Sequence, residues 1–155
     1  MDGHRAAERR ASLERASYLN DAYRTLKQPV ARIAYLLELE GVWTPADRGP
    51  GASNQVPPAL LEEVFSLNEE LDEIREAREG GAAHEQVAAR LDAARTPIAH
   101  KQDEHERLVE ALSARWDADQ SRTTLEALRE CLLERTYLRN LLATIDREAA
   151  TLATA

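Results

Sequence analysis

Residues 19–41 read LNDAYRTLKQPVARIAYLLELEG, and this stretch decides how the first part of the chain folds. It predicts one helix that ends at about Lys27 and a second, short helix from Pro29 to about Leu39. Proline is tolerated in the first turn of a helix because its missing N–H has no intrahelical partner there. Gly41 stands where a glycine commonly caps a helix C-terminus. The stretch therefore predicts a pair of helices with a sharp turn between them.

The first helix of this pair is expected to begin near Glu8 and to carry an apolar stripe at helical spacing. The stripe consists of Leu13, Ala16, Leu19, Tyr23 and Leu26. Two helices alone form a poor core, and isolated helices of this length are marginal in water. We therefore expect residues 1–27 to fray, to fold back on the rest of the chain, or to self-associate with a second copy.

Composition and charge narrow the class of protein. The chain has 155 residues and a formal net charge of −8, which argues against nucleic acid as the main partner. No apolar run approaches the roughly 20 residues that span a bilayer, so no membrane partner is expected. A single cysteine excludes an internal disulfide framework and favours a reducing, cytoplasmic location. The charge is uneven, since residues 62–79 carry eight Asp and Glu against two Arg.

The rest of the chain divides into a linker and three helical segments. Residues 42–58 hold four of the six prolines, together with Gly49, Gly51, Ser53 and Asn54, and predict a loop and a domain boundary. Three apolar seams at spacings of three and four follow. They are Leu60, Val64, Leu67, Leu71 and Ile74; Val87, Leu91, Ala94, Ile98, His105, Leu108 and Leu112; and Leu128, Cys131, Leu138, Leu142, Ile145, Ala149 and Leu152. Seams joined by short turns predict an antiparallel three-helix bundle in residues 59–155.

Single residues predict where these helices end or bend. Gly80 and Gly81 are expected to end the first helix of the bundle. Pro97 lies inside the second and should kink or split it, because proline removes a hydrogen bond of the helix interior at a cost of about 3 kcal/mol. Asp119 is the expected N-cap of the last helix.

Some apolar residues fall outside the seams. Leu61 and Phe65 lie about 100° round the helix from Leu60 and Val64, and steps of four extend their row to Glu69 and Glu73. On the last helix, Leu133, Tyr137 and Leu141 form a comparable row. Antiparallel packing of the first and last helices of the bundle would set the two rows side by side. The alternative is a wide apolar stripe that is simply buried.

The pattern N-x-A-Y-x-T-L-x-x-P-x-x-R-x-x-Y-L-L within residues 20–37 resembles the last two helices of the J-domain in the HscB family of iron–sulfur co-chaperones. The matching residues are Asn20, Ala22, Tyr23, Thr25, Leu26, Pro29, Arg32, Tyr35, Leu36 and Leu37. In J-domains, a His-Pro-Asp tripeptide before this helix pair acts on the Hsp70. The 155 residues open Met1-Asp2-Gly3-His4 and contain no such tripeptide. We therefore expect contact with an HscA-type Hsp70 to be impaired and its ATPase not to be stimulated, whether the N-terminus is native or truncated.

The segment LEEVFSLNEELDEI, residues 61–74, resembles the helix with which HscB proteins bind the iron–sulfur scaffold IscU. The resemblance implies scaffold contacts at Leu61, Phe65, Glu69 and Glu73, and an aromatic contact from Tyr137 on the last helix. Two positions depart from the family. Glu62 replaces a usual apolar residue, and Ser66 stands where an acid is common, so these two contacts are not carried over.

Other chemistry has little support in the sequence. His100 and His105 are five residues apart, so they cannot share a metal ion as an i, i+4 pair could. Cys131 lies on a predicted seam and is expected to be a buried apolar residue rather than a nucleophile or a cluster ligand. An all-helical enzyme similar to chorismate mutase would need several basic residues facing inward. The seams contain almost none apart from Arg135, which favours a binding module.

These observations predict an all-α chain with a residual J-domain helix pair in residues 1–41, a linker in 42–58 and a three-helix scaffold-binding domain of the HscB C-terminal oligomerisation type in 59–155. The expected function is that of a non-enzymatic co-chaperone that binds an IscU-type scaffold and presents it to an HscA-type Hsp70. No cofactor and no bound metal are expected. The alternatives are the small helical enzyme and a generic helical interaction module.

Overall fold

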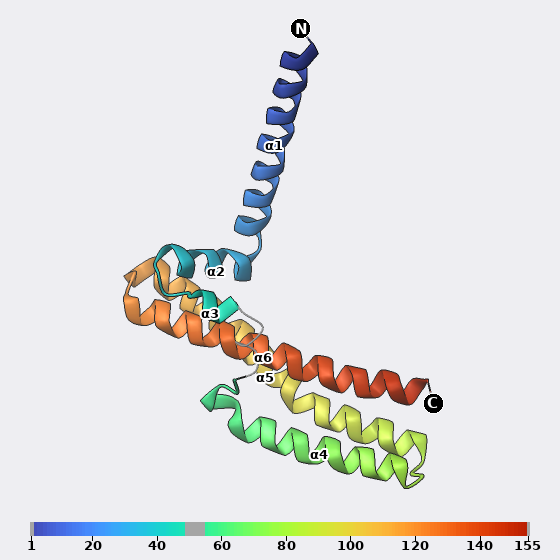
Figure 1. The fold of residues 1–155 in the computed structure, drawn as a ribbon. Helices are drawn as coiled ribbons and strands as arrows, with labels where there is room; N and C mark the ends of the chain where they lie inside the picture. The colour runs from blue at the N-terminus through green and yellow to red at the C-terminus, as the bar shows by residue number, and fades with distance from the viewer. Residues whose placement is uncertain (1, 49–54, 155) are drawn as a thin grey trace. The chain divides into compact units, whose positions relative to one another are not determined.

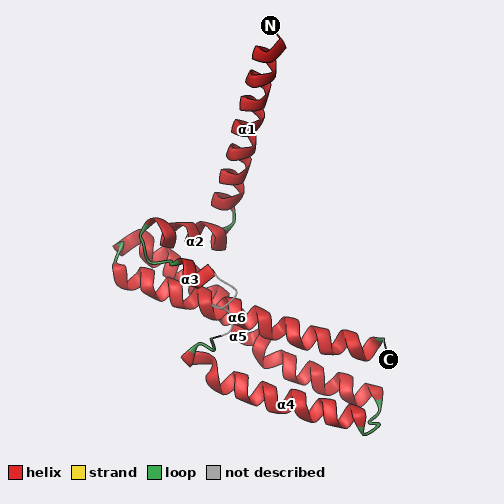
Figure 2. Ribbon diagram, in the orientation of Figure 1, coloured by secondary structure: helices red, strands yellow, loops and turns green. Residues whose placement is uncertain are grey.

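The structure is a computed structural model that describes residues 2–48 and 55–154. Every regular element within these ranges is helical (Figure 2), which confirms the prediction of an all-α chain. In the same ranges no helix is long and apolar enough to cross a membrane. The chain forms two compact units, Met1–Trp43 and Thr44–Ala155. The predicted linker residues Gly49, Gly51, Ser53 and Asn54 lie outside the described residues.

The first unit is a pair of helices, α1 (Asp2–Lys27) and α2 (Pro29–Leu39), shown in Figure 1. Helix α1 starts six residues earlier than predicted. The break between the two helices follows from Pro29, because the residue before a proline is pushed out of the helical region, and Gln28 is indeed extended at φ −87° and ψ 121°.

Helix α2 ends in the manner that Gly41 predicts. Glu40 is the cap residue, and Gly41 follows it with a φ of 69°. The Gly41 N–H donates to the Glu38 carbonyl at 3.1 Å, and the Val42 N–H donates to the Leu37 carbonyl at 2.8 Å. This pair of bonds is the Schellman motif, in which a left-handed residue lets the chain turn back and satisfy the last carbonyls.

The apolar stripe predicted on α1 is exposed to solvent. Leu13, Leu19, Tyr23 and Leu26 are each more than half exposed. Lys27 places its ammonium group 5.4 Å from the centre of the Tyr23 ring. Self-association through this helix stays a prediction.

The second unit contains the three-helix bundle. It consists of α4 (Leu61–Glu79), α5 (His84–Asp119) and α6 (Arg122–Ala153), preceded by the short helix α3 (Pro45–Arg48) and a 3-10 turn at Pro58–Leu60 (Figure 1). Short turns join α4 to α5 and α5 to α6, so neighbours in sequence run antiparallel. Pro97 does not split α5, which continues through it as one helix.

The buried core follows the predicted seams at most of their positions. All five residues of the first predicted seam are buried, four of them on α4 and Leu60 in the 3-10 turn before it, as are most of the seam residues on α5 and α6. On α5, however, Val109 is buried and Leu108 is 44% exposed. Eleven residues make about three helical turns, so Val109 follows Ile98 on the same face and Leu108 does not. On α6, Ala149 is exposed.

The predicted N-cap at Asp119 is wrong. Asp119 is the last residue of α5, and Gln120 follows it with a left-handed φ of 45°. The chain needs these residues to reverse direction, so Ser121 caps α6 by accepting from the Thr124 N–H at 3.2 Å. The Asp119 carboxylate supports this cap from outside, since it accepts from the Ser121 N–H at 2.9 Å and from the Thr124 hydroxyl at 3.0 Å.

Candidate functional site

The off-seam residues at the start of α4 lie on the surface. Leu61 is 43% exposed and Phe65 is 67% exposed, while Leu60 and Val64, one residue before each, are buried. The pair is therefore not part of a wide buried stripe. Exposed apolar side chains that gather in a patch mark interaction sites, whereas single ones are ordinary.

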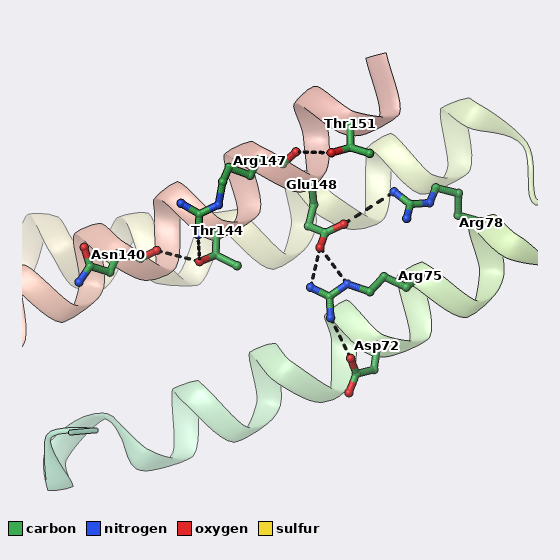
Figure 3. Close-up of polar contacts among 8 residues, drawn as sticks. All are labelled: Asp72, Arg75, Arg78, Asn140, Thr144, Arg147, Glu148 and Thr151. Carbon is green, nitrogen blue, oxygen red and sulfur yellow. Dashed lines mark hydrogen bonds and ion pairs between the residues drawn. The ribbon is translucent and has the colours of Figure 1, made fainter. Parts of the chain in front are cut away.

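Helices α4 and α6 run in the same direction, which corrects the prediction that they pack antiparallel. Each is antiparallel to α5, so reversing twice brings α6 parallel to α4. The ion pair between Arg75 and Glu148 agrees, since both residues lie toward the C-terminal ends of their helices (Figure 3). The two off-seam rows therefore lie on helices that run parallel.

This ion pair shows which flanks of α4 and α6 face each other. Leu61 lies fourteen residues before Arg75, which is about four turns and leaves the two within about 40° on the helix. Tyr137 lies eleven residues before Glu148 and Leu141 lies seven before it, which places both within about 20° of Glu148. The side chains of Tyr137 and Leu141 are half-buried and pack against the core.

Four apolar side chains therefore lie along the line where the parallel helices α4 and α6 face each other. We call them the α4–α6 patch; they are Leu61, Phe65, Tyr137 and Leu141. Phe65 stands furthest out, at about 80° from Arg75 on the helix. The patch joins three of the five residues that the sequence singled out. Leu141 belonged to the predicted off-seam row and was not among the expected contacts.

The two acids predicted as scaffold contacts, Glu69 and Glu73, face different sides of α4. Glu69 is exposed, and Glu73 bonds to α5, where the Arg90 guanidinium donates to it at 2.7 Å. A row of residues four apart drifts by about 40° at each step, so Glu73 is about 120° from Leu61. The structure places Glu73 on the α5 side of α4, away from the α4–α6 patch.

A cluster of charged side chains closes the C-terminal end of the patch. Arg75 donates to one oxygen of Glu148 through Nε at 2.8 Å and through Nη2 at 2.5 Å, and to Asp72 at 3.0 Å (Figure 3). Arg78 lies 3.7 Å from the other oxygen of Glu148. The Glu148 carboxylate raises the pKa of the Arg75 guanidinium. Both Arg side chains are thus committed to α6.

A groove of about 980 Å³ lies beside α6 and includes Leu133, Pro57 and Pro58 in its lining. A bidentate ion pair stands at this groove, where Arg129 donates to the two oxygens of Asp47 at 3.1 and 2.6 Å. The arginine lowers the pKa of Asp47 to about 2. The sequence contains no local signal for this contact, because the two residues are 82 positions apart.

The residues considered for metal binding or catalysis have structural partners. His105 is buried, with Nε2 2.6 Å from a Glu134 oxygen and Nδ1 3.0 Å from the Lys101 carbonyl. Arg135 donates to Glu106 at 2.6 Å. Within residues 2–48 and 55–154, no three side chains of the ligating types gather as a metal site would require. Cys131 is buried, and burial raises the pKa of its thiol to about 12.

Comparison with known proteins gives curated relatives that share one description, "Co-chaperone protein HscB homolog". The protein from Cupriavidus taiwanensis is 34% identical over 126 residues, which cover 81% of this chain and 63% of the relative. The proteins from Burkholderia multivorans and Burkholderia cenocepacia are each 29% identical over the same length and coverage. The match thus spans less than two thirds of the length of these relatives. No protein-family model and no solved structure matches the chain.

Proposed function

Since this chain is homologous to the HscB-family co-chaperones, we propose that it acts without catalysis in iron–sulfur cluster assembly and binds an IscU-type scaffold through the α4–α6 patch. An HscA-type Hsp70 is the proposed recipient of the scaffold, and the cytoplasm is the proposed compartment. The description that the relatives share, a co-chaperone protein, supports the co-chaperone role. The partner and the surface rest on the resemblance of residues 61–74 and on the exposure of the patch.

The observation that carries the proposal is the exposure of Phe65. It is the single phenylalanine of the chain, and it stands 67% exposed on a helix whose seam is buried throughout. Aromatic side chains are enriched at interfaces and among the few residues that dominate binding energy. Leu61 and the half-buried Tyr137 give the ring apolar neighbours, so a partner could cover all three at once.

The five proposed contacts are Leu61, Phe65, Glu69, Glu73 and Tyr137. We expect them to contribute unequally. The three apolar residues form one patch and should contribute most. Glu73 is already bonded to Arg90, so a partner would have to compete for its carboxylate.

The test measures binding of the 155-residue chain to the purified IscU-type scaffold by titration calorimetry. Replacing Leu61, Phe65 or Tyr137 with Ala should weaken binding by about 1–3 kcal/mol, the range of interface hot spots. Leu108→Ala is the matched control, because Leu108 on α5 is 44% exposed and Leu61 is 43% exposed. Equal losses from Leu61→Ala and Leu108→Ala, or no binding by the unmodified chain, would overturn the proposal.

A further inference from the structure

The carboxylates of α4 differ in whether the protein already uses them. Glu63 pairs with Lys101, Glu70 and Glu73 both pair with Arg90, and Asp72 pairs with Arg75. The other four acids form no ion pair with any residue in the described part of the chain; they are Glu62, Glu69, Glu76 and Glu79. These four carboxylates are the ones that a partner can engage without displacing an existing contact.

Helix geometry selects two of the four. Glu76 follows Phe65 by eleven residues, about three turns, so the two point within about 20° of each other. Glu69 lies between them and points within about 40° of Phe65. Glu62 points about 60° away from Phe65, further than either of these two, and lines a groove with Pro97 of α5. Glu79 is the last residue of the helix, about 21 Å from Phe65 along the axis.

The two arginines beside Glu76 in the sequence pair with other carboxylates. Arg75 bonds to Glu148 and Asp72, and Arg78 faces Glu148, so both are drawn toward α6. The segment 62–79 keeps eight acidic residues against these two arginines. The face that begins at Phe65 therefore ends in exposed, uncompensated negative charge.

We propose that Glu76, together with Glu69, is the acidic half of the docking surface and determines the charge of the partner segment that fits it. This inference rests on the proposed function. The matching segment of the scaffold places an apolar side chain against Phe65 and Tyr137 and a Lys or Arg about 16 Å further along α4, opposite Glu76. Glu76 is thus a more accessible acidic contact than Glu73, because the Glu73 carboxylate already accepts from Arg90 of α5.

Charge complementarity of this kind should affect binding in a way that is sensitive to salt. An exposed ion pair contributes up to about 1 kcal/mol, so Glu76→Gln should weaken scaffold binding about threefold to fivefold at low salt. Glu76→Lys should weaken it about tenfold or more, because repulsion is added. Both losses should shrink when the salt concentration is raised.

The experiment measures the affinity of the 155-residue chain and its variants for the IscU-type scaffold at low and at high salt. Glu110→Lys is the control for net charge, since Glu110 is exposed on α5 and outside the patch. Glu73→Gln compares the acid that points toward α5 with the acid that points along Phe65. Circular dichroism of each variant verifies that the helices are intact, as expected for exposed positions.

The results separate the inference from the function on which it rests. A salt-dependent loss for Glu76→Lys, with a larger loss for Glu76→Gln than for Glu73→Gln and with Glu110→Lys within twofold of the unmodified chain, supports the inference. If Phe65→Ala weakens binding while Glu76→Lys does not, the inference fails and the proposed function stands. If the unmodified chain does not bind the scaffold, both fail.

Discussion

Arg75 on α4 and Glu148 on α6 form an ion pair that joins these two parallel helices beside the α4–α6 patch (Figure 3). Two nitrogens of the guanidinium donate to one carboxylate oxygen, and the Glu148 side chain is only 18% exposed. Arg78 adds a second cation at 3.7 Å. Because α4 and α6 are not adjacent in the chain, no turn holds them together, and side-chain contacts must do so.

The first prediction concerns this ion pair. Glu148→Gln keeps the shape of the side chain and removes its charge, so it should lower the free energy of unfolding by about 1 kcal/mol. Urea denaturation measures the change, and a double-mutant cycle with Arg75→Ala isolates the pairwise part. Asp146→Asn is the control, because its pair with Arg95 lies on the α5 side and is about half exposed. Equal effects at both sites would mean that the Arg75–Glu148 pair has no special role.

The second prediction concerns pH. The Arg129 guanidinium lowers the pKa of Asp47 from 3.8 to about 2, and the Asp47 side chain is 7% exposed. A carboxylate whose folded-state pKa is depressed stabilises the fold above its unfolded pKa, so this contribution is complete above about pH 5 and is lost as pH falls toward 2. The loss should amount to about 2 kcal/mol.

Denaturation curves between pH 6 and pH 2 test this prediction when the unmodified chain is compared with Asp47→Asn. The variant should be less stable at pH 6, and the difference should shrink to a few tenths of a kcal/mol, about RT ln 2, near pH 2. Arg129→Lys should retain part of the effect only, because lysine cannot form the bidentate contact. A stability difference for Asp47→Asn that is constant over the whole range would contradict the assignment.

The third prediction compares core and surface on one helix. Leu71 is buried in the seam, so Leu71→Ala should destabilise the fold by about 2–5 kcal/mol. Phe65→Ala removes a side chain that is mostly exposed and should cost less than about 0.5 kcal/mol. Thermal or urea unfolding of both variants measures the difference. If the two variants were equally unstable, Phe65 would be part of the core and the α4–α6 patch would not exist as a free surface.

Much of the fold could be predicted because the local spacing of apolar residues determines which face of each helix is buried. Spacings of three and four located the seams, and Pro29, Gly41 and the Gly80-Gly81 pair marked helix ends. The errors arose where local pattern does not decide. Leu108 and Val109 are both apolar neighbours, and only counting whole turns from Ile98 selects Val109.

The candidate surface shows the same limit. The sequence indicated that Leu61 and Phe65 lie off the seam, because the direction of each side chain around the helix axis depends on α4 alone. The relation of α4 to α6 depends on chain direction across two turns, and there the expectation of antiparallel packing was wrong. The Glu73–Arg90 and Asp47–Arg129 contacts join residues far apart in sequence, so no local spacing could predict that their charges are paired.

The last prediction concerns Cys131, whose reactivity reports on the packing between α5 and α6. The thiol is buried, and its sulfur donates to the His105 carbonyl oxygen at 3.8 Å. Because burial raises its pKa to about 12, only about one thiol in ten thousand is a thiolate at pH 8, and the thiolate is the reactive form. The native chain should therefore react with a chromogenic disulfide reagent far more slowly than the unfolded chain in urea. Thr123→Cys in the Cys131→Ala background supplies an exposed thiol on the same helix as the control. If native Cys131 reacted as fast as that control thiol, the α5–α6 interface would be open at this position and the thiol would be available for chemistry.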